Sequence, residues 1–253
     1  MRIAVITGAS SGMGREFVRR IDLSETLDEI WVIARRRERL ESLAKETRAP
    51  LRIIPLDLTK DESIDEYKSL LEAETPDVAI LVNAGGAGRF CAFRDAALDD
   101  YREMIDLNAK ALMAMTYVTL PFMKAGGCIY QLGSLSAFQP VPYIGVYGAT
   151  KAFVLSFSRA LNAELRHSGI RVMAVCPGWV RTEFFDHAVK DDTICYYNRF
   201  YDADQVVKTA MKDMKRGKDV SVCGFPIKAQ VLATKLLPHK MVMRIWLKQQ
   251  KKL

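Results

Sequence analysis

The sequence predicts an α/β fold in which a seven-stranded parallel sheet is covered by helices on both faces. Short apolar runs rich in valine and isoleucine alternate with longer segments whose apolar residues recur at helical spacing. The runs show no polar alternation, which is typical of parallel strands buried on both faces. No low-complexity linker or internal repeat interrupts the pattern. We therefore expect one domain, with its body at residues 1–225 and a helical extension at residues 226–253.

Seven apolar runs are the expected strands. They are Ile3–Ile6, Ile30–Ala34, Leu51–Leu56, Val78–Val82, Cys128–Leu132, Val172–Cys176 and Asp219–Cys223. Between and around them we expect helices at residues 13–22, 37–47, 62–73, 100–124, 148–168 and 203–216. Strands that alternate with helices imply βαβ units, and a series of such units forms a doubly wound sheet.

A glycine-rich turn stands between the first expected strand and the first expected helix. Glycines at this spacing let backbone N–H groups approach a pyrophosphate at the N-terminus of a helix. Ordinary turns also need glycine, but the position after the first strand of an α/β pattern favours a Rossmann-type dinucleotide site. The residues expected to contact the nucleotide here are Gly8, Ser10, Ser11, Gly12, Met13 and Gly14.

The end of the second expected strand indicates which dinucleotide binds. Sites for NAD often carry an acidic residue about 20 residues beyond the glycines, where it holds the ribose 2′-hydroxyl. This chain reads Ala34-Arg35-Arg36-Arg37 there, and arginines suit a 2′-phosphate. We therefore predict NADP(H) as the cofactor, with Arg35 as the first contact and Arg36 beside it. The alternative is a solvated basic helix start, but cations there oppose the helix dipole and need a compensating partner.

Two further segments complete the expected nucleotide site. Asp57, with Leu58 beside it, follows the third strand, where a carboxylate can accept a hydrogen bond from the adenine amine. Asn83, Ala84 and Gly85 follow the fourth strand, where small residues let the backbone lie against the adenosine half. Each segment alone also fits an ordinary turn, because Asn, Asp and Gly are common turn residues.

Lys151 lies in the fifth expected helix, and Tyr147 directly precedes that helix, four residues before the lysine. On a helix the two side chains share one face, and the cation favours the phenolate by lowering the tyrosine pKa. Such a tyrosine can give a proton to a carbonyl oxygen or take one from an alcohol. Ser134, at the end of the fifth strand, can hydrogen-bond the same oxygen. Asn108 stands inside an expected helix, where asparagine is unfavourable, which points to a polar role.

These residues together resemble the short-chain dehydrogenase/reductase family, over nearly the whole chain from Arg2 to about Gly224. The resemblance is carried, in the family's order and spacing, by the glycine-rich turn, Asn83-Ala84-Gly85, Asn108, Ser134, Tyr147, Lys151 and Pro177-Gly178-Trp179-Val180-Arg181-Thr182. It implies Tyr147 as the catalytic acid/base and Ser134 as the residue that orients and polarises the carbonyl. It further implies that Lys151 binds the nicotinamide ribose, while Asn108 holds a water that relays protons to Lys151.

The resemblance also implies contacts around the nicotinamide ring, at Pro177, Gly178, Val180 and Thr182, with Thr182 facing the carboxamide. Some NADP-preferring members of the family carry a basic residue just before the second glycine, where this chain has Ser11. The predicted preference for NADP(H) therefore rests on the arginine cluster at residues 35–37 alone.

Aromatic residues gather in the segments that shape the substrate pocket of such folds. They are Phe90, Phe93, Phe138, Tyr143, Phe184, Phe185, Tyr196, Tyr197, Phe200 and Tyr201. An aromatic surround suits an apolar or aromatic ketone or aldehyde, although half of these rings fit a core equally well. Arg181 and Arg199 are candidate contacts for an anionic substrate.

The formal net charge of +7 comes from the C-terminal extension, because residues 228–253 carry seven more basic than acidic side chains and the rest of the chain is neutral. We expect two short amphipathic helices broken at Pro238. Such a basic extension suits a neighbouring subunit in a homodimer or homotetramer, a lid over the site, or an anionic membrane surface. A solvated end is the remaining alternative. Nucleic acid is not an expected partner, because the body offers no basic groove.

Five cysteines without a CxxC pair predict reduced thiols, and three scattered histidines predict no metal site. We expect no signal peptide and a cytoplasmic location. The favoured function is an NADP(H)-dependent oxidoreductase that reduces an apolar or aromatic ketone or aldehyde. Two others stay open: a dinucleotide-binding regulatory or scaffold protein, and a peripheral membrane enzyme acting on lipid-like carbonyls.

Overall fold

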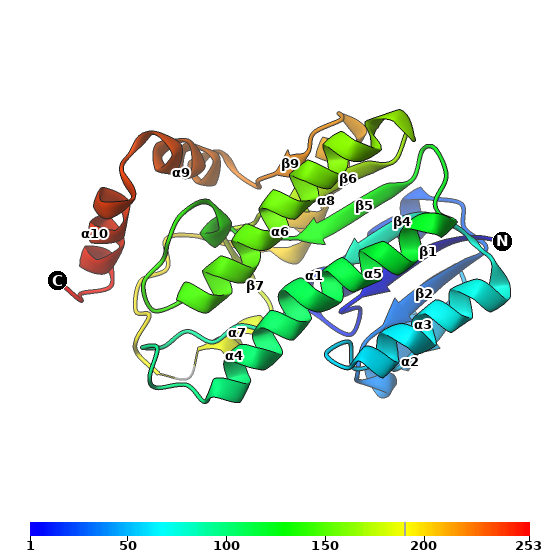
Figure 1. Ribbon diagram of the computed structural model, residues 1–253, viewed down its shortest axis with the longest axis horizontal. Helices are drawn as coiled ribbons and strands as arrows, with labels where there is room; N and C mark the ends of the chain where they lie inside the picture. The colour runs from blue at the N-terminus through cyan, green and yellow to red at the C-terminus, as the bar shows by residue number, and fades with distance from the viewer. Residues whose placement is uncertain (190) are drawn as a thin grey trace.

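Seven parallel strands form the central sheet in the part of the chain that the structure describes, residues 1–189 and 191–253 of a computed structural model. Their order is β3-β2-β1-β4-β5-β6-β9 (Figure 1). The strands are β1 Arg2–Thr7, β2 Glu29–Ile33, β3 Leu51–Ile54, β4 Asp77–Asn83, β5 Cys128–Leu132, β6 Arg171–Val175 and β9 Val220–Ser221. Each pairing in this sheet is parallel, which confirms the fold class that the sequence predicts.

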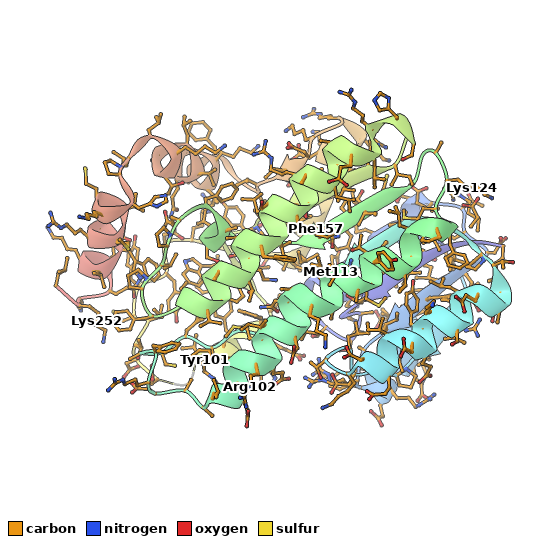
Figure 2. The ribbon with its side chains drawn as sticks, viewed as in Figure 1. Tyr101, Arg102, Met113, Lys124, Phe157 and Lys252 are labelled. Atoms are coloured by element: carbon orange, nitrogen blue, oxygen red, sulfur yellow. The ribbon has the colours of Figure 1, made fainter. Side chains whose placement is uncertain are left out.

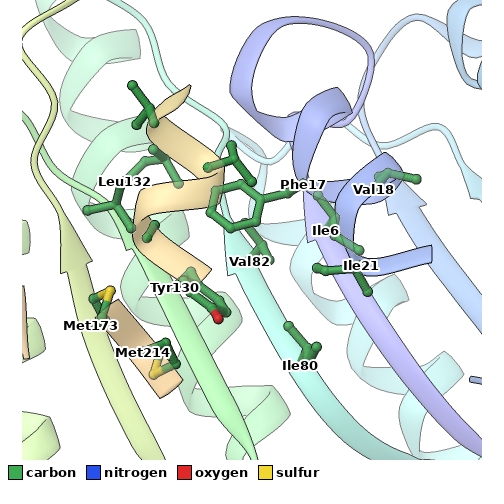
Figure 3. Packing of buried hydrophobic residues seen from close by; sticks show 14 of the residues in the cluster. Ile6, Phe17, Val18, Ile21, Ile80, Val82, Tyr130, Leu132, Met173 and Met214 are labelled. Atoms are coloured by element: carbon green, nitrogen blue, oxygen red, sulfur yellow. The ribbon is translucent and has the colours of Figure 1, made fainter. Parts of the chain in front are cut away.

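Helices cover both faces of the sheet, because successive strand residues point to opposite sides and both sides are apolar. One layer holds α1 Gly12–Ser24, α2 Arg37–Ala44 and α8 Ala203–Lys215, and the other holds α3 Asp61–Glu74, α5 Leu112–Thr119 and α6 Gly145–Glu164. Figure 3 shows the first layer, where Phe17 and Ile21 of α1 face Ile6 and Val82 of the strands. These layers fix the carboxyl ends of the strands in place.

The order of the strands opens a crevice beside β1. This strand has β2 on one side and β4 on the other. The chain leaves β1 toward β2 and β3 and then crosses back to β4, so the helices that follow β1 and β4 cover opposite faces of the sheet. In open α/β sheets, ligands bind outside the carboxyl ends of the strands at such a point.

Close backbone contacts hold the glycine-rich turn against the strands. A Cβ on Gly14 would lie 2.3 Å from the carbonyl oxygen of Gly8, and a Cβ on Gly8 would lie 2.7 Å from the backbone nitrogen of Gly85. Gly8 and Gly12 also have φ values of 65° and 52°, which favour glycine. Helix α1 can therefore begin directly above the ends of β1 and β4.

The helix expected at residues 100–124 spans residues 98–122 and is not uniform. Helix α4, Leu98–Ile105, runs into a π-helical turn, Asp106–Ala111, which continues as α5 and a 3₁₀ turn, Leu120–Phe122. A π turn inside an α-helix is rare and is found frequently at functional positions. Asn108 lies within this turn.

The sequence does not predict two short strands and a short helix that follow β6. Strand β7, Trp179–Arg181, pairs in parallel with β8, Phe200–Asp202, and α7, Phe184–Ala188, lies between them in the chain. Elements this short contain too few residues to show a hydrophobic period. The strands expected at Leu51–Leu56 and Asp219–Cys223 are also shorter, as β3 and β9, because each lies at an edge of the sheet and pairs on one side only.

The C-terminal extension forms the two expected helices, α9 Phe225–Leu236 and α10 His239–Gln249, with Pro238 at the break. Both lie at the end of the molecule opposite the N-terminus (Figure 1). The α10 residue Trp246 donates its indole N–H to the carbonyl oxygen of Pro142 over 3.0 Å, so this helix is fixed to the body. Every helix of residues 1–189 and 191–253 is too short or too polar to cross a lipid bilayer.

Candidate active site

A cavity of about 890 Å³ opens at the carboxyl ends of the strands. Its volume falls in the range of small-molecule and cofactor sites, roughly 300–1,000 Å³. Most of the predicted site residues line it: Gly8, Ser10, Ser11, Gly12, Met13, Gly14, Arg35, Arg36, Asp57, Leu58, Ala84, Gly85, Ser134, Tyr147, Lys151, Pro177, Gly178, Val180 and Thr182. Asn83 and Asn108 do not line it and lie behind its wall.

One end of the cavity has the shape and the donors that a dinucleotide needs. A Cβ on Gly12 would lie 3.1 Å from Cγ2 of Thr182, so the glycine lets the segment after β6 pack against the glycine-rich turn. The first N–H groups of a helix have no intrahelical acceptors and attract phosphate. The residues at the start of α1 therefore fit a pyrophosphate.

Arg36 is the arginine bonded to the glycine-rich turn. Its Nη2 donates to the hydroxyl oxygens of Ser10 at 3.1 Å and Ser11 at 3.0 Å. Its Nη1 donates to Oε2 of Glu183 at 3.1 Å, and Arg39 donates to the same oxygen at 2.6 Å. Hydrogen bonds and charge from Arg39 and Arg36 hold the pKa of the Glu183 carboxyl below its usual value. Glu183 is thus the compensating partner that cations at this helix start require.

The side chain of Arg35, the expected first contact of a 2′-phosphate, points toward α4 and not toward the glycine-rich turn. Its Nη1 donates to Oε1 of Glu103 on α4 at 3.2 Å, and its side chain is more exposed than that of Arg36. Asp57 lies at the same end of the cavity, where its carboxylate accepts hydrogen bonds from the backbone N–H and the hydroxyl of Thr59, at 3.1 and 2.9 Å. Both arginines and this carboxylate therefore surround one end of the cavity.

Asn83 has a place that differs from the one expected. Its side-chain amide is buried and donates to Thr116 Oγ1 at 3.1 Å and to Gln131 Oε1 at 2.9 Å, inside the second helix layer. The two backbone N–H groups that follow it donate to Thr7 Oγ1 at 3.0 and 3.1 Å. Asn83 therefore fixes the end of β4, while its two small neighbours line the cavity.

A hydrogen bond joins α6, which carries Tyr147 and Lys151, to the end of β5, which precedes Ser134. Helix α6 begins at Gly145, earlier than the expected residue 148, so Tyr147 lies in its first turn and Lys151 one turn later. Lys151 is 4% exposed, and its Nζ donates to the carbonyl oxygen of Leu132, the last residue of β5, over 2.7 Å. Because Ser134 stands two residues beyond Leu132, this bond also sets α6 beside Ser134.

The hydroxyl of Ser134 is oriented by its neighbours. Its oxygen accepts hydrogen bonds from the backbone N–H of Ser136 at 3.2 Å and from the Ser136 hydroxyl at 3.0 Å. A serine hydroxyl has two acceptor sites and one donor, so its own proton can be donated to the phenol of Tyr147. That hydrogen bond acts to lower the pKa of Tyr147.

Burial, however, decides the protonation of the tyrosine and the lysine. It raises the pKa of Tyr147 to about 12, against the smaller lowering by Ser134, and it lowers the pKa of Lys151 to about 8. The pKa of Tyr147 is therefore raised, not lowered as expected, because removing the phenolate from water costs more than the hydrogen bond from Ser134 returns. At neutral pH Tyr147 is a phenol, the form that donates a proton.

Asn108 lies behind the cavity wall and is hydrogen-bonded to residues on both sides of it. Its Nδ2 donates to the Ala87 carbonyl oxygen at 2.9 Å and to Thr150 Oγ1 at 3.1 Å, and its Oδ1 accepts from the Ala87 N–H at 2.9 Å. A Cβ on Gly86 would lie 3.2 Å from Asn108 Oδ1 and 3.5 Å from Lys151 Nζ. Asn108 therefore joins the segment after β4 to α6, beside the lysine. Its expected role in a water relay stays a prediction.

The other end of the cavity is aromatic. The ring centroids of Phe90 and Phe184 lie 5.4 and 5.6 Å from that of Tyr147. Four of the ten expected aromatic residues line the cavity, namely Phe90, Phe184, Phe185 and Tyr196. The other six, Phe93, Phe138, Tyr143, Tyr197, Phe200 and Tyr201, lie elsewhere.

Several cavity residues are not among those that the sequence predicts for the site or the substrate pocket. Trp179 and Trp246 line the aromatic end with their ring centroids 6.5 Å apart, although they are far apart in the chain. Neither Arg181 nor Arg199 lines the cavity, whereas Arg89 does and forms an ion pair with Asp100 at 2.8 Å. Only the fold shows which of these side chains share a wall.

Comparison with known proteins connects this geometry with a family. Residues 2–193 match the family model described as short chain dehydrogenase. The NADP-dependent 3-hydroxy acid dehydrogenase of Escherichia coli K12 is 37% identical over 194 residues, which cover 75% of this chain and 77% of the relative.

Solved structures agree over more of the chain. A short-chain dehydrogenase from Sphingobium yanoikuyae in complex with NADPH is 27% identical, with a TM-score of 0.79 and coverage of 96% of each chain. The bulky-bulky ketone specific alcohol dehydrogenase from Comamonas testosteroni is also 27% identical, with a TM-score of 0.75 and coverage of 96% of this chain and 94% of the other.

Replacement of Lys151 by Met tests the cost of the buried charge. The lowered pKa of Lys151 corresponds to about 3 kcal/mol, at ~1.4 kcal/mol for each unit, and the lost bond to Leu132 returns ~1 kcal/mol. We expect urea unfolding at pH 7 to show the Lys151→Met protein more stable by about 2 kcal/mol. This advantage shrinks from pH 8 to 10.5, because the unfolded lysine then binds a proton that the folded one does not.

The exposed Lys124 of Figure 2 supplies the control. Its side chain is 75% exposed, so Lys124→Met should change the free energy of unfolding by less than about 0.5 kcal/mol. A Lys151→Met protein that is less stable than the parent at pH 7 would contradict a net cost of the buried ammonium.

Proposed function

The chain belongs to the short-chain dehydrogenase family, and from that premise we propose that it is an NADP(H)-dependent oxidoreductase that reduces an apolar or aromatic ketone or aldehyde. The observation that carries this proposal is the position of Tyr147. Its buried phenol lies in one cavity whose two ends differ, with glycine, serine and arginine at one end and aromatic rings at the other. A cofactor and an apolar substrate can therefore meet beside the phenol.

The catalytic roles follow from the protonation and the bonding of these residues. NADPH, when bound, supplies a hydride to the carbonyl carbon. Tyr147 gives its proton to the substrate oxygen as negative charge develops there, and the Ser134 hydroxyl donates a hydrogen bond to the same oxygen. Lys151 keeps a positive charge near the phenol and stabilises the phenolate that forms. Asn108 holds the wall beside Lys151.

The preference for NADP(H) rests on the arginines after β2. A 2′-phosphate suits guanidinium groups, and Arg36 already joins the glycine-rich turn to α2. The relative from E. coli is NADP-dependent by name, and the structure from S. yanoikuyae contains NADPH. Both agree with this choice of cofactor.

The aromatic end favours an uncharged substrate. The ketone-specific enzyme from C. testosteroni acts on bulky ketones by name, which agrees with this wall, whereas the E. coli relative acts on 3-hydroxy acids. Arg89 is a cation on the cavity wall that a carboxylate substrate could use, but it is already paired with Asp100. Comparing kcat/KM for a bulky aryl ketone and a 3-oxo acid separates the two classes, and a clear preference for the acid contradicts the proposal.

Replacement of Tyr147 by Phe tests the catalytic role. We expect NADPH oxidation in the presence of a bulky aryl ketone to slow by about 10²–10⁴-fold, the usual worth of a positioned proton donor. The dissociation constant of NADPH, measured by fluorescence, should change by less than about twofold, because the ring remains. Tyr143, which does not line the cavity, supplies the control Tyr143→Phe.

Substantial activity in Tyr147→Phe would place the proton donor elsewhere. NADPH binding without turnover in the parent protein would favour a regulatory or scaffold role.

The C-terminal extension forms the outer wall of the substrate end. Its residues Leu237, Val242, Ile245 and Trp246 line the cavity. Gln250, 1% exposed, accepts hydrogen bonds from the backbone N–H groups of residues 195 and 196 at 2.9 and 3.0 Å. This packing supports a fixed lid over the substrate end, one of the roles expected for the extension.

A membrane role for the same extension rests on its outer surface. Phe225, Leu232 and Leu236 of α9 are exposed, and Lys228 and Lys235 lie on the same helix. An apolar face beside cations suits an anionic bilayer. Co-sedimentation of the full chain with anionic vesicles tests this alternative, and a protein that stays in the supernatant removes it.

A second copy of the chain is the expected partner of another apolar face. Met113 and Tyr117 of α5 and Phe153 of α6 are exposed, and Phe153 stacks on Phe157 with 5.8 Å between ring centroids. Met113 and Phe157 lie on the same broad face of the molecule (Figure 2). Exposed apolar patches of this kind mark interfaces between proteins, which agrees with a homodimer or homotetramer.

Replacement of Tyr117 by Glu tests this interface. We expect sedimentation velocity at micromolar concentration to show an oligomer for the parent protein and a shift toward monomer for Tyr117→Glu, because a carboxylate would be buried without a partner. Leu98, exposed but on α4, supplies the control Leu98→Glu. A parent protein that sediments as a monomer contradicts the interface.

Replacement of Trp246 by Ala tests the lid. Trp246 lies against Trp179 at the substrate end, so its loss should raise KM for a bulky ketone about tenfold, or ~1.4 kcal/mol, and leave the NADPH dissociation constant unchanged. Met241→Ala is the control, because Met241 is exposed on the same helix and does not line the cavity. An unchanged KM in Trp246→Ala would show that the substrate does not reach this wall.

A further inference from the structure

A carboxylate from a distant part of the chain lies on the arginines after β2. Glu183 accepts hydrogen bonds from Arg36 at 3.1 Å and from Arg39 at 2.6 Å. The sheet order brings them together, because the segment after β6 and the start of α2 both lie at the carboxyl ends of the strands. Glu183 is 147 residues from Arg36 in sequence, so no local pattern indicates the pair.

Glu183 and the glycine-rich turn share one guanidinium. While Arg36 Nη1 donates to Glu183, its Nη2 donates to the hydroxyls of Ser10 and Ser11. Arg36, Glu183 and both serines line the cavity. The carboxylate therefore lies at the nucleotide end of the cavity, bonded to the same arginine that donates to the glycine-rich turn.

The neighbours of Glu183 hold it at this position. Thr182 lies against Gly12, since a Cβ on the glycine would be 3.1 Å from the threonine Cγ2. On the other side, Phe184 packs on the ring of Tyr147 with 5.6 Å between centroids. The backbone of Glu183 is thus held between the glycine-rich turn and Tyr147, while its carboxylate stays partly exposed to the cavity.

The chemistry of the two dinucleotides differs at this point. A carboxylate accepts a hydrogen bond from a ribose 2′-hydroxyl, which is why NAD sites often carry an acidic residue after the second strand. This chain has arginines there instead. A 2′-phosphate would compete with Glu183 for the donors of Arg36 and Arg39, and its charge would be repelled by the carboxylate.

We propose that Glu183 sets the selectivity of this site between NADPH and NADH, by supplying from the segment after β6 the carboxylate that β2 lacks. The inference rests on the proposed function, because it assumes a nicotinamide dinucleotide in the cavity. Glu183 weakens the binding of NADPH and supports that of NADH, so the parent protein is less selective than its arginines alone would make it.

The test is direct titration with each nucleotide, followed by quenching of protein fluorescence, to which Trp179 in the cavity wall contributes. For Glu183→Gln we expect the dissociation constant of NADPH to fall about tenfold, the order of one relieved like-charge contact near a protein surface. The constant for NADH should stay the same or rise. Glu183→Asp keeps the charge and should stay within about threefold of the parent in the ratio of the two constants.

A charge control comes from the same helix as Arg39. Glu41 lies 3.9 Å from Arg37 and does not line the cavity, so Glu41→Gln changes the net charge equally and should leave both constants within about twofold of the parent. Weaker NADPH binding in Glu183→Gln, or an equal change for both nucleotides, overturns the inference while the proposed function stands. A parent protein that binds neither nucleotide overturns both.

Discussion

The hydrogen bond from the Lys151 ammonium to the Leu132 carbonyl oxygen is the contact on which the site depends. It ties helix α6 to the end of β5 at 2.7 Å, and so it places Tyr147 and Ser134 beside each other. Burying an ammonium that donates to a neutral carbonyl oxygen costs stability, which the large apolar layers on both faces of the sheet offset. The cost is concentrated where the chemistry takes place, as is common for functional sites.

Topology supplies the rest of the arrangement. The strand order opens a crevice at the ends of β1 and β4, and glycines at positions 8 and 14 let the backbone of α1 close over it. The same edge of the sheet receives the segments after β5 and β6, which carry Ser134 and Thr182. Residues from distant parts of the chain thus line one cavity, with a polar nucleotide end and an aromatic substrate end.

The sequence predicts those parts whose signal is local. The seven strands, the glycine-rich turn and the helical spacing of Tyr147 and Lys151 all show themselves within a few residues, and the structure contains each of them. Contacts across the chain are different. Trp246 lines the cavity because α10 folds back on Pro142. Glu183 pairs with Arg36 because it lies between a short strand and a short helix, β7 and α7, that the sequence does not predict. The direction in which the pKa of Tyr147 shifts also needs the fold, because burial outweighs the hydrogen bond from Ser134.

The most direct test of the account is to follow the hydride itself. NADPH deuterated at the transferring position of its nicotinamide ring is mixed with the protein and a bulky aryl ketone, and the product is examined by mass spectrometry. The account predicts an alcohol with one deuterium on its carbinol carbon and a slower reaction than with unlabelled NADPH. Alcohol without deuterium, or bound NADPH that reduces no carbonyl compound, would contradict hydride transfer in this cavity.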